Sequence, residues 1–106
     1  MVNILLVCAA GMSTSLLVAK MENAAKARAL EVNIRAVAVS EAARHLDQAD
    51  VVLLGPQVRY MVDKVQKDAE PYGIRVGVID PVHYGMIHGD AVLQQALRLQ
   101  GSHENL

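Results

Sequence analysis

Short apolar segments alternate four times with longer segments of helical periodicity along this chain of 106 residues. The apolar segments lie at residues 2–7, 32–39, 51–54 and 74–79, and each has the length of a single strand. Because parallel strands need long, right-handed and usually helical crossovers, this alternation predicts an α/β fold with a parallel sheet covered by helices on both faces. Strands buried on both faces should be continuously apolar, and these segments are mainly apolar.

Helices are predicted at residues 13–29, 40–46, 56–70 and 90–99. Ser40 is expected to cap the second helix, and Pro56 suits the first turn of the third. The side chains expected to face the sheet recur at helical spacing: Leu16, Leu17, Met21 and Ala24 or Ala25 in the first helix, and Val58, Met61, Val62 and Val65 in the third.

The composition limits size, partners and location. Because 53% of the residues are hydrophobic, residues 1–106 are expected to form a single domain around one core, with a polar tail from about residue 101. A net charge of -1 without a basic block argues against nucleic acid and anionic lipid as ligands. The apolar start lacks a preceding basic residue and is interrupted by Gly11, so no membrane insertion is expected. A single cysteine favours a reducing, cytoplasmic location.

Cys8, that single cysteine, lies where the first apolar strand meets a turn rich in small and hydroxyl-bearing residues. In a parallel α/β sheet, ligands bind beyond the carboxyl ends of the strands. Four loops are expected to converge there, at residues 8–13, 39–41, 55–57 and 80–85. Since Cys8 begins the first of these loops, it is the leading candidate for chemistry.

The loop after Cys8 is typical of a phosphate-binding turn. A strand–loop–helix junction directs backbone N–H groups and the positive end of the helix dipole into one concavity, which stabilises a phosphate or a thiolate. Cys8 is therefore predicted to be a nucleophile. The residues predicted to hold the phosphoryl group are Ala9, Ala10, Gly11, Met12, Ser13, Thr14 and Ser15. The alternative is a small, inert cysteine buried at a strand end.

Three segments resemble one known family in matching order. Residues 8–18 read CAAGMSTSLLV and look like the phosphocysteine loop of the IIB components of the sugar phosphotransferase system, in the lactose/cellobiose (chitobiose) class. Residues 49–58, ADVVLLGPQV, resemble the third strand and following turn of that class. Ile79 and Asp80, with Tyr84 and Gly85, resemble its fourth strand and loop. The resemblance extends over nearly the whole chain, but it does not name the sugar.

The resemblance implies a phosphoryl relay. A IIA component carries a phosphohistidine, the thiolate of Cys8 attacks its phosphorus, and the group then passes to a sugar bound by the membrane-embedded IIC component. The fold implied is an open four-stranded parallel sheet of order 2-1-3-4, similar to that of low-molecular-weight tyrosine phosphatases. Family members commonly have Ser after the cysteine, where this chain has Ala9, so one hydroxyl donor is missing from the expected cradle.

Two other functions are compatible with parts of the sequence. Low-molecular-weight tyrosine phosphatases have an arginine six positions after the cysteine, followed by a serine, and this chain has Thr14 and Ser15 there. Without an arginine to clamp the phosphate, efficient hydrolysis is not expected. Asp80 and Pro81 are similar to the acid-bearing loop of those phosphatases, and the sequence leaves Asp80 open as a loop anchor or a proton donor. The third possibility is a non-catalytic binding module.

Other polar side chains give weaker signals. Arg59 is expected to be a solvated helix charge, and Tyr60 and Tyr84 are expected to pack with their hydroxyl groups reaching water. The four histidines are interpreted as surface or loop residues: His45, His83, His88 and His103. Because they are scattered and there is one cysteine, no metal site or cofactor is predicted.

Overall fold

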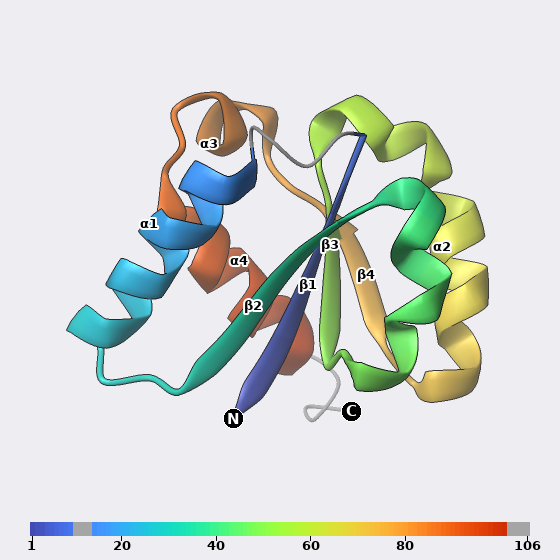
Figure 1. Cartoon of the computed structure of the whole chain (residues 1–106), viewed down its shortest axis with the longest axis horizontal. Helices are drawn as coiled ribbons and strands as arrows, with labels where there is room; N and C mark the ends of the chain where they lie inside the picture. The colour runs from blue at the N-terminus through green and yellow to red at the C-terminus, as the bar shows by residue number, and fades with distance from the viewer. Residues whose placement is uncertain (10–13, 102–106) are drawn as a thin grey trace.

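Four parallel strands form one sheet in the order β2-β1-β3-β4, which confirms the expected topology (Figure 1). The computed structural model describes residues 1–9 and 14–101. The strands span Val2–Cys8 (β1), Val32–Ala38 (β2), Val51–Leu54 (β3) and Arg75–Val78 (β4). All four lie within about one residue of the predicted segments, because mainly apolar runs of strand length between helical segments are a clear signal.

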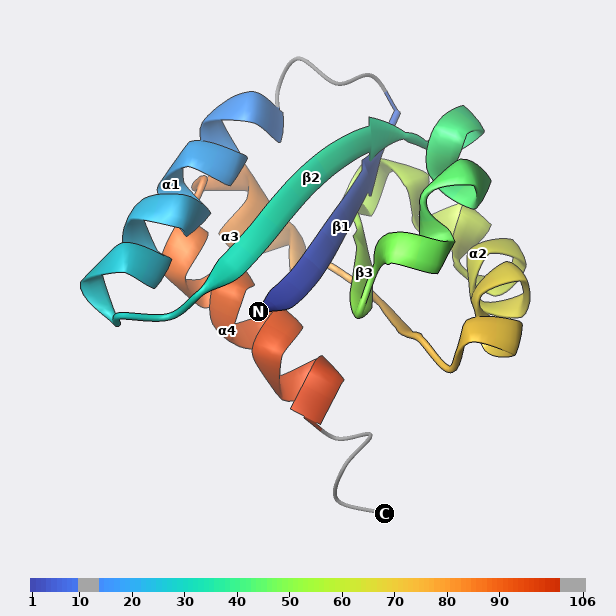
Figure 2. The same ribbon diagram turned by 60° about the horizontal axis from the view of Figure 1, so that its bottom comes forward.

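Helices cover both faces of the sheet (Figures 1 and 2). One face carries α1 (Thr14–Ala27) and α4 (Gly89–Gly101). The other carries the 3-10 helices η1 (Val39–Arg44) and η2 (Leu46–Gln48) together with α2 (Val62–Ala69). None of the helices in the described ranges is long and apolar enough to cross a membrane.

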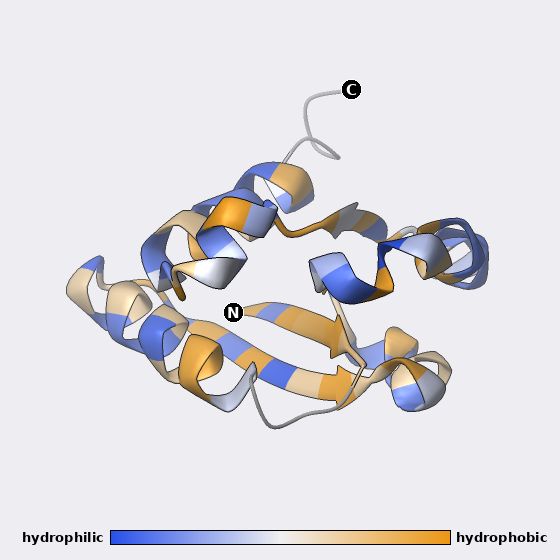
Figure 3. Cartoon of the chain, turned by 90° about the horizontal axis from the view of Figure 1, so that it is seen from above, coloured by the Kyte–Doolittle hydropathy of each residue, from blue (hydrophilic) through white to orange (hydrophobic). Residues whose placement is uncertain are grey.

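The sheet separates two hydrophobic clusters. Side chains alternate along β1, so Leu6 packs with Leu17, Met21 and Leu93 on the α1–α4 face, while Leu5 packs with residues of η1 and α2 on the other. Figure 3 shows strands that are mainly apolar with a few hydrophilic positions, and helices that mix apolar and hydrophilic positions. Because β1 lies between β2 and β3, its carboxyl end is surrounded by structure on both sides.

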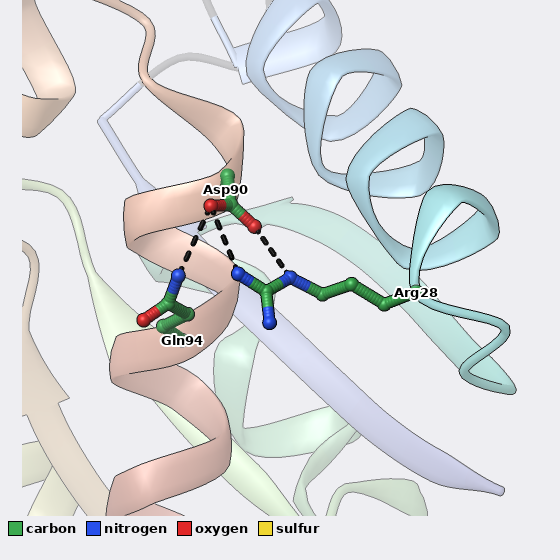
Figure 4. A network of polar contacts seen from close by, with 3 residues as sticks. All are labelled: Arg28, Asp90 and Gln94. Carbon is green, nitrogen blue, oxygen red and sulfur yellow. Dashed lines mark hydrogen bonds and ion pairs between the residues drawn. The ribbon is translucent and has the colours of Figure 1, made fainter.

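An ion pair connects α1 and α4, the two helices that share one face of the sheet. Arg28, just beyond α1, approaches Asp90 with Nε 2.8 Å from Oδ1 and Nη2 3.1 Å from Oδ2 (Figure 4). Gln94 Nε2 also donates to Oδ2 of Asp90, at 3.0 Å. This bidentate contact joins the C-terminal end of α1 to the first turn of α4.

Two local expectations are wrong. Ser40 does not cap a helix: η1 begins at Val39, and no side chain caps it. Leu16 is 51% exposed. The buried face of α1 contains Leu17, Met21 and Ala25, and a residue next to Leu17 in sequence is rotated by about 100° around the helix, away from that face.

The helix predicted at 56–70 is three shorter pieces. These are η3 (Pro56–Met61), α2 and η4 (Glu70–Tyr72), and the backbone leaves helical geometry at Val58, with φ -117° and ψ 20°. Pro56 occupies the first turn of η3, as predicted. Val58 and Val65 are buried as predicted, and the half-buried Met61 and Val62 pack against the same cluster.

The loop expected at 80–85 contains a short helix, α3 (Pro81–Gly85). The last helix continues to Gly101, slightly beyond the predicted end at residue 99. The predicted polar tail otherwise falls at 102–106, outside the described residues.

Candidate functional site

Cys8 is the last residue of β1 and is fully buried, with 0% of its surface exposed. Its position at the carboxyl end of the central strands is the one predicted. Its burial differs from the expectation of a nucleophile open at the mouth of the sheet. Burial at a strand end is the feature that the alternative of an inert cysteine predicted.

Two polar groups contact the sulfur. The thiol of Cys8 donates to the main-chain oxygen of Val37 in β2, with Sγ 3.4 Å from O. The hydroxyl oxygen of Thr14 lies 3.1 Å from Sγ. Since Thr14 is the first residue of α1, the sulfur is held between β2 and the start of the helix that follows the loop.

Thr14 itself is 1% exposed, and it is the one buried polar side chain reported for residues 1–9 and 14–101. Its neighbour Ser15 is exposed, as is Ala9 on the other side of the loop. The remaining predicted phosphate-binding residues lie outside the described residues: Ala10, Gly11, Met12 and Ser13. The predicted ring of backbone donors at those positions stays a prediction.

A hydrogen bond joins two of the other loops at this end of the sheet. Gln57 Nε2 donates to the hydroxyl oxygen of Tyr84 at 2.9 Å, and the ring of Tyr84 packs against the cluster on the α1–α4 face. A Cβ atom at Gly55 would lie 2.7 Å from Oε1 of Gln57, so the absence of a side chain there leaves room for this arrangement. Tyr60, in contrast, is exposed. Sequence reasoning missed Gln57, because no spacing rule connects it to Tyr84.

Asp80 is exposed and caps α3. Its Oδ1 accepts from the backbone N–H of Val82 at 2.8 Å, and its own N–H lies 3.4 Å from Oε1 of Gln95. Of the two roles that the sequence left open, this geometry is that of a loop anchor.

Arg59 is exposed and forms no ion pair with any described residue, in agreement with a solvated helix charge. The rings of His83 and His88 meet edge to face, with centroids 5.8 Å apart. Across the described ranges, no three His, Cys, Asp or Glu side chains are grouped as metal ligands would be.

A cysteine at the end of the first strand, directly before a helix start in a 2-1-3-4 sheet, defines a class of small α/β proteins with a cysteine loop. The family model described as "PTS system, Lactose/Cellobiose specific IIB subunit" matches residues 3–95. The chain belongs to this IIB family of the sugar phosphotransferase system. Its members are phosphotransferase components that act with IIA and IIC components in sugar uptake.

Two relatives align with this chain over almost its whole length. The chain is 46% identical to the oligo-beta-mannoside-specific EIIB component of Bacillus subtilis, covering 93% of this chain and 96% of the relative. It is 45% identical to the galactose-specific EIIB component of Lactococcus lactis subsp. cremoris, covering 91% of this chain and 94% of the relative.

Two solved structures share the fold. The cellobiose-specific IIB component of Borrelia burgdorferi has a TM-score of 0.79 at 40% identity, covering 95% of this chain and 93% of that one. The lactose-specific IIB domain of Streptococcus pneumoniae has a TM-score of 0.83 at 22% identity, covering 92% and 96%, and supports the fold alone.

Proposed function

We propose that Cys8 is the phosphoacceptor of this IIB component, taking the group from a phosphohistidine of IIA and passing it to a sugar bound by the membrane-embedded IIC. The observation that carries the proposal is the position of the only cysteine at the carboxyl end of β1, next to the first turn of α1. Family membership supplies the phosphoryl-carrier role. The single free cysteine supports a cytoplasmic site of action.

The two transfers balance without a metal or cofactor. In the first, an S–P bond forms while the P–N bond of the phosphohistidine breaks, and the thiol proton ends on the released histidine. In the second, the S–P bond breaks while an O–P bond to the sugar forms, and the proton of the sugar hydroxyl replaces the phosphoryl group on sulfur. Cys8 is thus restored as a thiol for the next cycle.

Residues 9–15 are proposed to hold the phosphoryl group of the phosphocysteine. The support is the position of α1, a helix of 14 residues whose first turn contacts the sulfur through Thr14. Unpaired N–H groups of a first turn, together with the helix dipole, favour a phosphate group at that end. An adjacent hydroxyl, on Ser15, is exposed at the same turn.

Sequence similarity to the relatives does not single out one sugar. Relatives named for oligo-β-mannosides, galactose and cellobiose are 46%, 45% and 45% identical to this chain. In the proposed relay the sugar is bound by IIC, and this chain contributes the phosphocysteine.

The test is the intact mass of the protein after incubation with the upstream phosphotransferase proteins. The wild type and His83→Gln should each gain one phosphoryl group, and Cys8→Ser should gain none. Blocking the thiol with iodoacetamide beforehand should also abolish the gain. An acid-labile adduct that persists in Cys8→Ser would move the phosphoacceptor to a histidine.

The same samples separate a carrier from a phosphatase. With Thr14 in place of a clamping arginine and the Asp80 carboxylate bound to the backbone of Val82, the phosphocysteine should persist until an acceptor arrives. Rapid release of inorganic phosphate without sugar or permease would contradict the carrier role. Phosphate acceptance untouched by loss of Cys8 would point instead to a binding module phosphorylated elsewhere.

A further inference from the structure

The hydroxyl group of Thr14 is directed at the sulfur of Cys8. The two side chains lie 3.1 Å apart and are 1% and 0% exposed. A buried hydroxyl is costly to keep without a hydrogen-bond partner, and here a partner is the reacting atom itself. The sequence predicted that Thr14 holds phosphoryl oxygens, and the geometry gives its side chain a contact with sulfur as well.

Ionisation of the sulfur fixes the direction of this bond. A thiol has one proton, which the oxygen of Val37 or that of Thr14 can accept. A thiolate has none, so after ionisation the hydroxyl of Thr14 is the donor in its bond to Sγ. When the sulfur ionises, the bond to Val37 is lost because a thiolate cannot donate, whereas the bond from Thr14 strengthens because its acceptor is now charged.

We propose that Thr14 is a positioning residue that stabilises the Cys8 thiolate, both as it attacks the phosphohistidine and as it is released from phosphocysteine. This inference rests on the proposed function of Cys8 and assigns one further role in the same site. Sulfur carries negative charge as a thiolate before the S–P bond forms in the first transfer, and it regains that charge as the S–P bond breaks in the second. A preorganised donor at sulfur lowers the free energy of this charged state in both transfers. Val37 has the opposite effect, since its carbonyl oxygen favours the protonated resting thiol.

The test is a titration of Cys8 followed by the ultraviolet absorbance of the thiolate, with Cys8→Ser as the baseline. Removing the hydroxyl in Thr14→Val should shift the pH midpoint of ionisation upward by about one to two units, because a hydrogen bond to a charged group is lost. Thr14→Ser keeps the donor and should return the midpoint close to that of the wild type. Phosphoryl transfer from IIA below the midpoint should slow by about tenfold in Thr14→Val, and Thr14→Ser should restore it.

The titration distinguishes positioning from packing. A purely structural role for Thr14 would alter unfolding and leave the midpoint in place, and an unchanged midpoint in folded Thr14→Val would overturn the proposal. So would a Thr14→Ser midpoint shifted as far as that of Thr14→Val. If the valine variant does not fold, Thr14→Ala removes the same hydroxyl and is judged in the same way. Continued phosphorylation of Cys8→Ser would refute the function proposed for Cys8 but leave the titration result standing.

Discussion

Asp80 illustrates how one side chain can be fixed by its local bonds. It is exposed, but its carboxylate accepts from the N–H of Val82 and so begins α3. Pro81, the first residue of that helix, has no N–H group and a favourable φ for a first turn. The Asp-Pro pair is therefore a helix start, and α3 in turn carries the Tyr84 hydroxyl to Gln57.

Replacing the cap should cost stability. Asp80→Ala is expected to lower the free energy of unfolding by about 1 kcal/mol, because the Val82 N–H loses its acceptor. Urea denaturation followed by circular dichroism measures the change. Asp80→Asn keeps a cap oxygen and is the control. Equal losses in both variants would mean that the negative charge, not the cap, stabilises this turn.

At the level of single residues, the sequence located Cys8 in the fold but not the contacts of its sulfur. Cys8 could be placed because strand end, loop and helix start are consecutive in the chain. Burial was expected only under the alternative of an inert cysteine, because the contacts of the sulfur with Val37, from a neighbouring strand, and with Thr14 form only in the folded sheet. Leu16 was misplaced for a related reason: adjacent leucines at helical spacing leave open which of the two faces inward.

Among the elements, α1 and α4 approach each other closely, and this approach depends on one glycine. A Cβ atom at Gly89 would lie 2.4 Å from the carbonyl carbon of Lys20 and 2.6 Å from the backbone nitrogen of Met21. Backbone atoms cannot move aside as a flexible side chain can. The two helices can lie this close only while position 89 has no side chain.

Gly89→Ala should therefore destabilise the protein by about 1–3 kcal/mol, the usual cost of forcing extra volume into a packed contact. Thermal or urea unfolding measures it. The matched control is Gly101→Ala in the same helix, where a Cβ meets no atom within 4 Å and little change or a slight gain is expected. A loss in Gly101→Ala as large as in Gly89→Ala would trace the effect to the helix itself and not to its packing.

The elements themselves were predictable to different degrees. All four strands followed from their apolar runs, and the order of the sheet followed from family resemblance. The break at Val58 was not predictable, because Val58 and Val65 remain on the buried side across it and the apolar periodicity continues. Likewise α3 is too short, at five residues, to leave a periodic signal.

On the scale of the whole molecule, the ion pair of Arg28 and Asp90 connects two segments that lie 62 positions apart in the sequence. The hydrogen bond from Arg28 lowers the pKa of Asp90 below its ordinary value of 3.8, and the hydrogen bond from Gln94 acts in the same direction while desolvation opposes both. A carboxyl group with a lowered pKa stabilises the folded state above its ordinary value. That contribution is lost as the pH falls through the lower, folded-state value.

Stability near neutral pH should thus be lower in Asp90→Asn than in the wild type, and the difference should shrink as the pH falls below 3.8. Urea unfolding over a pH series measures it. Because the pair is partly exposed, the difference should also decrease at high salt. Glu22→Gln, an exposed site on α1, is the control. A gap between Asp90→Asn and wild type that stays constant down to strongly acidic pH would show that the charge of Asp90 contributes nothing.

The complete burial of the Cys8 sulfur should protect it from oxidation while the protein is not bound to a partner. Peroxide and disulfide reagents attack exposed thiolates, and a thiol with no accessible surface resists them. An idle copy of this chain should consequently endure oxidative stress without forming sulfenic acid or a cross-linked pair. In the proposed relay, burial would thus keep the sulfur of Cys8 reduced between transfers.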